Sequence, residues 1–260
     1  MSFIYQEQPA NSSFAEAIWK TEDTADGMYL AAADGSWDLI FTTSPEGETT
    51  VLASGPSSRA SPVPYRQGNR NFGIRFRPGA FMPHLPAAQM RDVTTALPQR
   101  SKHSFWFQGE EWQLPTFENA GEYLAKLARR QLVAHDNIVT AVLGGLRPPV
   151  SDRTVQRRFL HATGLTPTYI SNINRANQAV ALLQRGTTIS DVVTELGYAD
   201  QAHMTRRVKH VSGRTPGEII KKVEECRLRS IPNYGVCAQM KVQNIKGETN
   251  YGGKTVQNSN

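Results

Sequence analysis

The chain has 260 residues, a formal net charge of +6 and two cysteines. This length allows two hydrophobic cores, and so few cysteines exclude a small secreted fold held together by disulfides. Residues 1–118 carry 9 Lys and Arg against 13 Asp and Glu, residues 119–225 carry 15 against 9, and residues 226–260 carry 5 against 1. A polyanion such as nucleic acid is therefore expected to bind the later part of the chain, not the acidic first part.

The first part of the chain has the alternating pattern of half-buried β-strands. Apolar and polar residues alternate over 37–41, after the turn signal Asp34-Gly35, and over 72–77, before Pro78-Gly79. We predict a β-rich domain over residues 1–116.

A catalytic or metal-binding role of this domain has little support. A metal site needs several ligands that converge on one point, whereas His84, His103 and His135 are isolated. No nucleophile elbow, Walker loop or dinucleotide fingerprint is present. We expect no enzymatic activity, no cofactor and no metal, with a cupin-type metal-binding or enzymatic domain as the alternative. Metal analysis of the purified protein separates the two.

Three tryptophans are candidates for a pocket that binds a small-molecule effector: Trp37, Trp106 and Trp112. Buried tryptophans more often belong to the core, which is the favoured interpretation. A helix is predicted over residues 117–133, leading into the second half, and its apolar residues suit either core packing or dimerisation.

Residues 151–170 are repeated 49 positions later, at 200–219. The identical pairs are Arg157/Arg206, Arg158/Arg207, His161/His210, Gly164/Gly213, Thr166/Thr215, Pro167/Pro216 and Ile170/Ile219. Each copy opens with an N-cap residue, Ser151 or Asp200, and reaches a glycine suited to a left-handed C-cap. The Thr-Pro pair that follows starts another helix at once. The repeat therefore predicts helix, tight turn and helix, twice.

The first helix of each copy has one polar and one apolar face. Arg153, Gln156 and Arg157 share a face in the first copy, and Ala202, Thr205, Arg206 and Lys209 repeat that face in the second. Arginine can pair with guanine, glutamine with adenine, and small or methyl-bearing side chains can touch the thymine methyl in the major groove. A single such face is most often simply solvated. Two copies with the same caps favour DNA contact.

The residues around the second copy complete a helix-turn-helix unit. Residues 188–191 are suited to a capping box, residues 189–196 form an apolar helical stripe, and Gly197 makes the turn. Residues 170–183 follow helical spacing up to Gly186, which predicts a helix that links the two units.

The segment before the first copy, where the corresponding supporting helix should lie, contains residues that break helices. Gly144-Gly145 and Pro148-Pro149 do not suit a helix interior, where a proline costs ~3 kcal/mol. We expect this first supporting helix to be short or distorted, which would displace Arg153 and make the two units unequal.

These features resemble the AraC/XylS family of bacterial transcription regulators over residues 121–222, most closely over 189–203 and 213–216. The resemblance implies two helix-turn-helix units joined by a linker helix. Val208 stands where the family prefers phenylalanine, which implies a smaller or repacked core in the second unit. By the resemblance, the base-reading residues are Arg153, Gln156 and Arg157 in the first unit and Gln201, Ala202, His203, Thr205 and Arg206 in the second. Arg207 and Lys209 complete the predicted DNA-binding set.

The first half resembles the small-barrel sensor domain found ahead of some family members, over residues 34–41, 54–56 and 73–79. We therefore expect an α+β protein: a β-rich, cupin-like small barrel over 1–116 and an all-α domain over 117–225. The tail at 226–260 contains Cys226 and Cys237, is rich in Asn, Gln, Gly and Lys, and is expected to be disordered.

The expected function is that of a cytoplasmic, sequence-specific transcription regulator, an activator by family behaviour, that binds double-stranded DNA without a membrane anchor. RNA polymerase, a small-molecule effector and a second copy of the chain stay open as further partners. The alternative is a protein-binding adaptor that kept the fold without DNA specificity.

Overall fold

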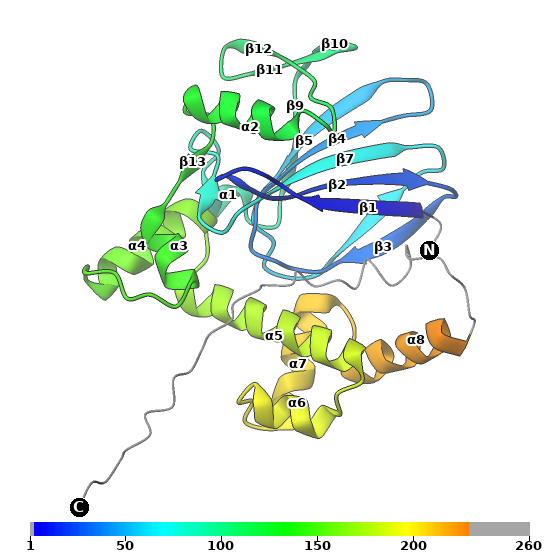
Figure 1. Cartoon of the computed structure of the whole chain (residues 1–260), viewed down its shortest axis with the longest axis vertical. Coiled ribbons are helices and arrows are strands. Elements are labelled where there is room, and N and C mark those ends of the chain that lie inside the picture. Colours follow the sequence, from blue (N-terminus) through cyan, green and yellow to red (C-terminus); the bar gives the residue numbers. More distant parts are fainter. Residues whose placement is uncertain (1–2, 229–260) are drawn as a thin grey trace, which may run out of the picture.

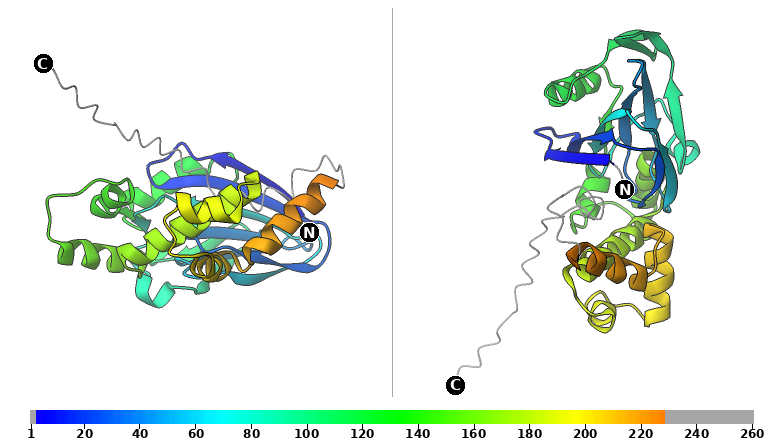
Figure 2. Two further views of the ribbon diagram at one scale, coloured as in Figure 1. Left: turned by 90° about the horizontal axis from the view of Figure 1, so that it is seen from below. Right: turned by 90° about the vertical axis from the view of Figure 1, so that its right-hand side faces the viewer.

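The computed structural model describes residues 3–228 of the chain. Strands occupy the first half and helices the second, so the predicted α+β organisation is confirmed. The helical half lies along one end of the β-rich half (Figure 1), and the side view in Figure 2 shows the two stacked along the long axis.

The main sheet of the β-rich half has six antiparallel strands in the order β1-β2-β7-β4-β5-β9. Their bounds are β1 Phe3–Pro9, β2 Ala15–Asp23, β4 Asp38–Thr43, β5 Thr49–Ser54, β7 Arg70–Phe76 and β9 Thr94–Leu97. Because β1 and β9 are edges that do not pair with each other, this sheet is open. Leu39, Ile74 and Phe76 are buried on its inner face, since alternate residues of a strand face the core.

Shorter strands complete this half. Their bounds are β3 Gly27–Ala31, β6 Ser61–Tyr65, β8 Ala80–Phe81, β10 Gln99–Ser101, β11 Ser104–Phe107, β12 Glu110–Gln113 and β13 Ala134–His135, and a short helix α1 spans Ala87–Met90. β3 pairs with β6, and β10, β11 and β12 form a small sheet. The pairing of β13 with β8 brings the chain back to the β-rich half after its first long helix.

That helix, α2, spans Ala120–Arg129, within the range predicted from the sequence. Leu124 and Leu127 are buried in the core, so they are used for packing within the chain. Trp37 and Trp112 also belong to the core, as the favoured interpretation has it, whereas Trp106 is 43% exposed.

The helical half contains α3 Asn137–Leu143, α4 Asp152–Thr163, α5 Pro167–Arg185, α6 Ile189–Glu195, α7 Gln201–Ser212 and α8 Pro216–Leu228. Helices α4 and α7 each have 12 residues and begin 49 positions apart, as the repeat predicts. The linking helix is α5, whose cap is Thr166 and which ends at Gly186 in the left-handed conformation. None of the helices within residues 3–228 has the length and hydropathy to cross a membrane.

The buried residues form two hydrophobic clusters. The larger one joins the sheet to α2, α3, α4 and the first half of α5, and includes Phe159 and, from α7, Val211. The smaller one lies between the end of α5 and helices α6, α7 and α8, and includes Val208. The core of the β-rich half therefore continues into the first helix-turn-helix unit. The predicted tail lies outside the described residues from 229 onwards, Cys237 included.

Candidate DNA-binding site

Helices α4 and α7 begin and end in the same way. The side chain of Ser151 accepts a hydrogen bond from the Thr154 N–H at 3.3 Å, and that of Asp200 accepts one from the His203 N–H. Gly164 and Gly213 end the two helices with φ of 64° and 73°, in the left-handed region where glycine is favoured. The capping residues that the repeat contains therefore bound two helices of the same length.

The supporting helices show where the two units differ. Both α3 and α6 have seven residues, so a short support is common to both units. From the start of α3 to that of α4 there are 15 positions, against 12 from α6 to α7. The three extra residues lie in the first connection, which contains Gly145 at φ 80° and both prolines. Arg153 nevertheless stands two residues after its N-cap, as Ala202 does, so the expected distortion is confined to the turn.

Most of the predicted site residues lie on the open side of the two helices. The exposed ones are Arg153, Gln156, Arg157, Gln201, Ala202, Arg206 and Lys209, and the half-buried ones are His203, Thr205 and Arg207. The opposite side packs through fully buried residues, Phe159 in α4 and Met204 and Val208 in α7. Each helix thus presents one polar stripe to solvent, and whether these residues contact bases stays a prediction.

The linker helix braces the second unit through Arg175, a residue that no local sequence signal marked. Its guanidinium lies 4.7 Å from the centre of the Tyr198 ring, and it donates to the Asn172 side chain at 3.0 Å. The Tyr198 ring in turn meets the His203 ring edge-on at 5.5 Å. Burial raises the pKa of the Tyr198 hydroxyl, and the nearby charge of Arg175 opposes that shift. The stack restricts the His203 side chain at the start of α7.

Arg158 has a role that its identity with Arg207 in the repeat did not indicate. Its Nε lies 2.8 Å from a carboxylate oxygen of Asp136, which is 2% exposed. The other carboxylate oxygen of Asp136 caps α3 by accepting from Ile138 and Val139. Arg158 therefore ties α4 to its supporting helix, while Arg157 beside it stays in the open stripe.

This neighbouring pair gives a direct test of the two roles. We expect Arg157→Ala to weaken specific DNA binding by ~1–3 kcal/mol without changing the melting temperature, because only the open stripe loses a side chain. Arg158→Ala should lower the free energy of unfolding by about 1–2 kcal/mol, because Asp136 loses a charged partner that is half exposed. Gel-shift titration and thermal melting of both variants measure the two effects. The reverse pattern would contradict the assignment.

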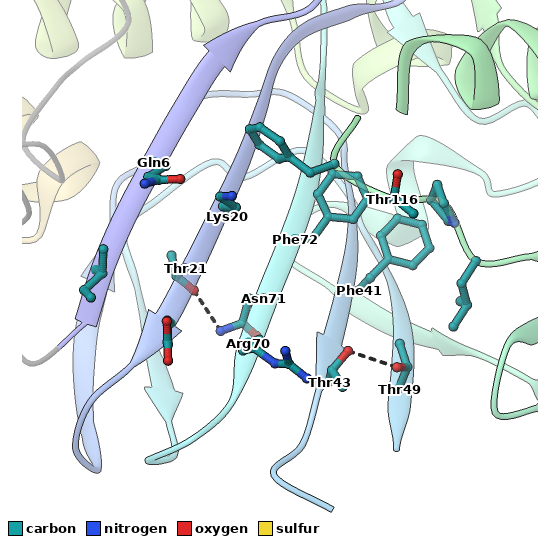
Figure 3. Close-up of a pocket in the computed structure, with 15 residues that line it drawn as sticks. Gln6, Lys20, Thr21, Phe41, Thr43, Thr49, Arg70, Asn71, Phe72 and Thr116 are labelled. Atoms are coloured by element: carbon teal, nitrogen blue, oxygen red, sulfur yellow. Dashed lines mark hydrogen bonds between the residues drawn. The ribbon is translucent and has the colours of Figure 1, made fainter. Parts of the chain in front are cut away.

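A cavity of about 670 Å³ opens on the inner face of the main sheet. Its floor consists of two rows of side chains that run across the strands. The first row is Gln6, Lys20, Phe72 and Phe41. The second row is Ile4, Glu22, Arg70, Thr43 and Thr49. Residues 114–117 form a wall (Figure 3). The Phe41 and Phe72 rings stack at 5.3 Å, and Lys20 lies over the Phe117 ring at 4.7 Å. The cavity thus combines an aromatic surface with two cations, Lys20 and Arg70, and one carboxylate, Glu22, and none of the three tryptophans lines it.

Among residues 3–225, no group of three or more His, Cys, Asp or Glu side chains is placed to bind a metal ion.

Comparison with known proteins gives a family match for the helical part of the chain. Residues 149–222 match the family described as a helix-turn-helix domain. No curated protein sequence matches the chain. Among solved structures, it is similar to one of ToxT from Vibrio cholerae, with 9% identity, a TM-score of 0.41, and coverage of 85% of this chain and 98% of that one. A second, of ToxT from Vibrio cholerae O395, gives 8% identity, a TM-score of 0.39, and coverage of 84% and 97%. These two likenesses are loose, and nothing about this chain follows from them.

The family match spans the two capped helices with exposed arginine stripes, the linker helix and the second supporting helix. The predicted resemblance is confirmed for this part of the chain, and residues 149–222 are an AraC-type helix-turn-helix DNA-binding domain.

Proposed function

We propose that the chain is a sequence-specific transcription regulator that reads two successive major grooves with α4 and α7. Successive major grooves on one face of DNA are roughly 34 Å apart. Because the two recognition helices belong to one chain and differ in sequence, a single copy would read an asymmetric site.

The observation that carries this proposal is the equivalence of Arg157 and Arg206. They occupy the same position of two helices with the same length and the same caps, and both are exposed. Phe159 and Val208 stand two positions further on and are fully buried, so each arginine is directed away from its core. Arginine in such a position can bond the major-groove edge of guanine with two hydrogen bonds.

Selection of binding sites from a random DNA pool tests the proposal. The full chain is expected to enrich two half-motifs about one helical turn apart. Its affinity should also fall with salt, with a slope of about −0.9 in log K against log [salt] for each phosphate neutralised. Enrichment of no motif, with binding to a protein partner retained, would contradict the proposal and favour the adaptor.

We also propose that the β-rich half regulates DNA binding and that its ligand site is the cavity on the main sheet. Support comes from its lining, in which Arg70 takes part in no ion pair within residues 3–225 and stands on the same sheet face as the stacked rings of Phe41 and Phe72, one cross-strand row away. Such a site suits a ligand with an apolar body and an anionic group. Activation is the outcome that the family resemblance favours, and repression of a reporter promoter carrying the selected site would contradict it.

A further inference from the structure

Both recognition helices end against the β-rich half at equivalent positions of the repeat. The indole N–H of Trp37 donates to the backbone carbonyl of Ala162, in α4, at 3.0 Å. The backbone N–H of Ala33 donates to the carbonyl of Val211, in α7, at 2.8 Å. Ala162 and Val211 are 49 positions apart, and both donors lie in the segment 32–37 that connects β3 to β4. One loop of the β-rich half therefore holds the C-terminal ends of both helices.

Two histidines that are identical in the repeat, His161 and His210, lie next to these contacts and have different partners. The His161 ring meets the Phe81 ring edge-on, with 5.0 Å between ring centres. The His210 carbonyl accepts a hydrogen bond from the Ala60 N–H at 3.0 Å. Neither histidine belongs to the DNA-facing stripe: the His161 ring packs on the β-rich half, and Nε2 of His210 lies 3.0 Å from the Tyr169 hydroxyl of the linker helix.

The two glycines that end the helices are also pressed against the β-rich half. A β-carbon at Gly164 would lie 2.5 Å from the carbonyl oxygen of Ala87, and one at Gly213 would lie 2.9 Å from a methyl group of Leu30. A larger residue at Gly164 would therefore push α4 away from the backbone of α1, whereas at Gly213 the Leu30 side chain could move aside. The repeat encodes two faces, one directed at DNA and one at the β-rich half.

The linker helix is attached to the same loops. Asn177 donates through its amide to the Ala33 carbonyl at 2.9 Å, so Ala33 bonds α5 and α7 at once. The Tyr169 hydroxyl lies 3.3 Å from the Ser58 carbonyl and 3.0 Å from Nε2 of His210. Segments 32–37 and 55–60, which we call the docking loops, thus contact both recognition helices, α4 and α7, and the linker helix α5.

The docking loops are themselves fixed to each other and to the sheet. The Ser57 hydroxyl donates to the Asp34 carboxylate at 3.0 Å, and the Gly35 N–H donates to the Ser57 carbonyl at 3.0 Å. Asp34 also lies 3.4 Å from Nε of Arg75, in the central strand β7. Movement of one docking loop alone would break these bonds, so the loops act as a rigid support.

The docking leaves the DNA-facing stripe open, since Arg153, Arg157 and Arg206 are all exposed. We propose that the docking loops set the spacing and relative orientation of α4 and α7, so that the β-rich half determines which separation of half-sites the chain accepts. This inference rests on the proposed function of DNA reading by both helices.

The test uses the full chain and the selected DNA site, with the spacer between half-motifs lengthened or shortened by one base pair. Wild type should lose on the order of 10²-fold in affinity with a changed spacer, because the second unit no longer engages. The variant Trp37→Phe with Tyr169→Phe removes the bonds to Ala162 and Ser58 and the contact of Tyr169 with His210, and it leaves a phenyl ring at each position. In this variant the loss of affinity on a changed spacer, which we call the spacer penalty, should shrink to about tenfold or less. The two units are then held less rigidly and can adjust to the new separation of the half-motifs at a smaller cost in free energy.

Tyr123→Phe is the matched control, since its buried hydroxyl has no hydrogen-bond partner in the described structure and lies in α2. It should keep the wild-type penalty. Thermal melting checks that each variant is folded, and the single variant Tyr169→Phe should show a smaller shift in the same direction if the double variant unfolds. An unchanged spacer penalty, or equal weakening at every spacer, would overturn the inference. If wild type selects no motif, the proposed function itself fails, whereas a motif read without spacing preference refutes the docking role alone.

Discussion

Replacing Arg206 by alanine is expected to lower the affinity of the chain for its selected DNA site by ~1–3 kcal/mol and to relax the preference at one base pair. Arg206 is exposed in the middle of α7, on the side opposite to buried Met204 and Val208. A guanidinium there can make two hydrogen bonds with guanine. Titration of the full chain against sites altered at each base pair locates the lost preference.

Arg206→Lys is the control for this result. Lysine keeps the charge that attracts phosphate but lacks the planar fork that bonds guanine twice. The lysine variant should therefore retain binding to unrelated DNA while losing most of the base preference. If Arg206→Ala instead weakens binding to all sequences equally, the side chain contacts phosphate only.

Phe159→Ala should lower the free energy of unfolding by about 3–5 kcal/mol, because the side chain is fully buried where α4 packs against the β-rich half. Val208 is its equivalent in the repeat and is equally buried, but it belongs to the smaller cluster around α6, α7 and α8. Val208→Ala removes less volume and should cost about 2 kcal/mol. Urea unfolding followed both by tryptophan fluorescence, which reports on the β-rich half, and by far-ultraviolet circular dichroism, which reports on the helices, measures the two costs.

The two variants should also differ in how far the damage spreads. Trp37 bonds the C-terminal end of α4, so loss of Phe159 is expected to change tryptophan fluorescence in the β-rich half. Val208→Ala should leave that signal unchanged. A cost of Phe159→Ala no greater than that of Val208→Ala would show that the core is not continuous across α4.

The sequence predicted the features that depend on neighbouring residues. Caps such as Ser151, Thr166 and Asp200, and the left-handed Gly164 and Gly213, are set within a few residues, and the structure has each of them. The glycines and prolines of residues 144–149 correctly marked an irregular segment. They lengthen the turn and leave α4 in place, because the Ser151 cap starts the helix independently of what precedes it.

Features that depend on distant residues could not be predicted in this way. The pair of Arg158 with Asp136 spans 22 positions, and the bond from Trp37 to Ala162 spans 125. Repeat identity alone did not separate Arg157, which is free to contact DNA, from Arg158, which pairs with Asp136, nor did it separate His161 and His210 from the DNA-facing stripe. Only the fold brings the partners of these residues together.

The continuous core has a consequence for how the chain is made. Strands β4 and β7 emerge from the ribosome well before α4 and α5, yet Trp37, Leu39 and Phe76 share one cluster with Phe159 and Ile173. The growing β-rich half therefore exposes apolar surface until the first recognition helix and the linker helix have been synthesised. Nascent chains stalled near residue 116 should consequently depend on chaperones, whereas those that extend past α5 should not.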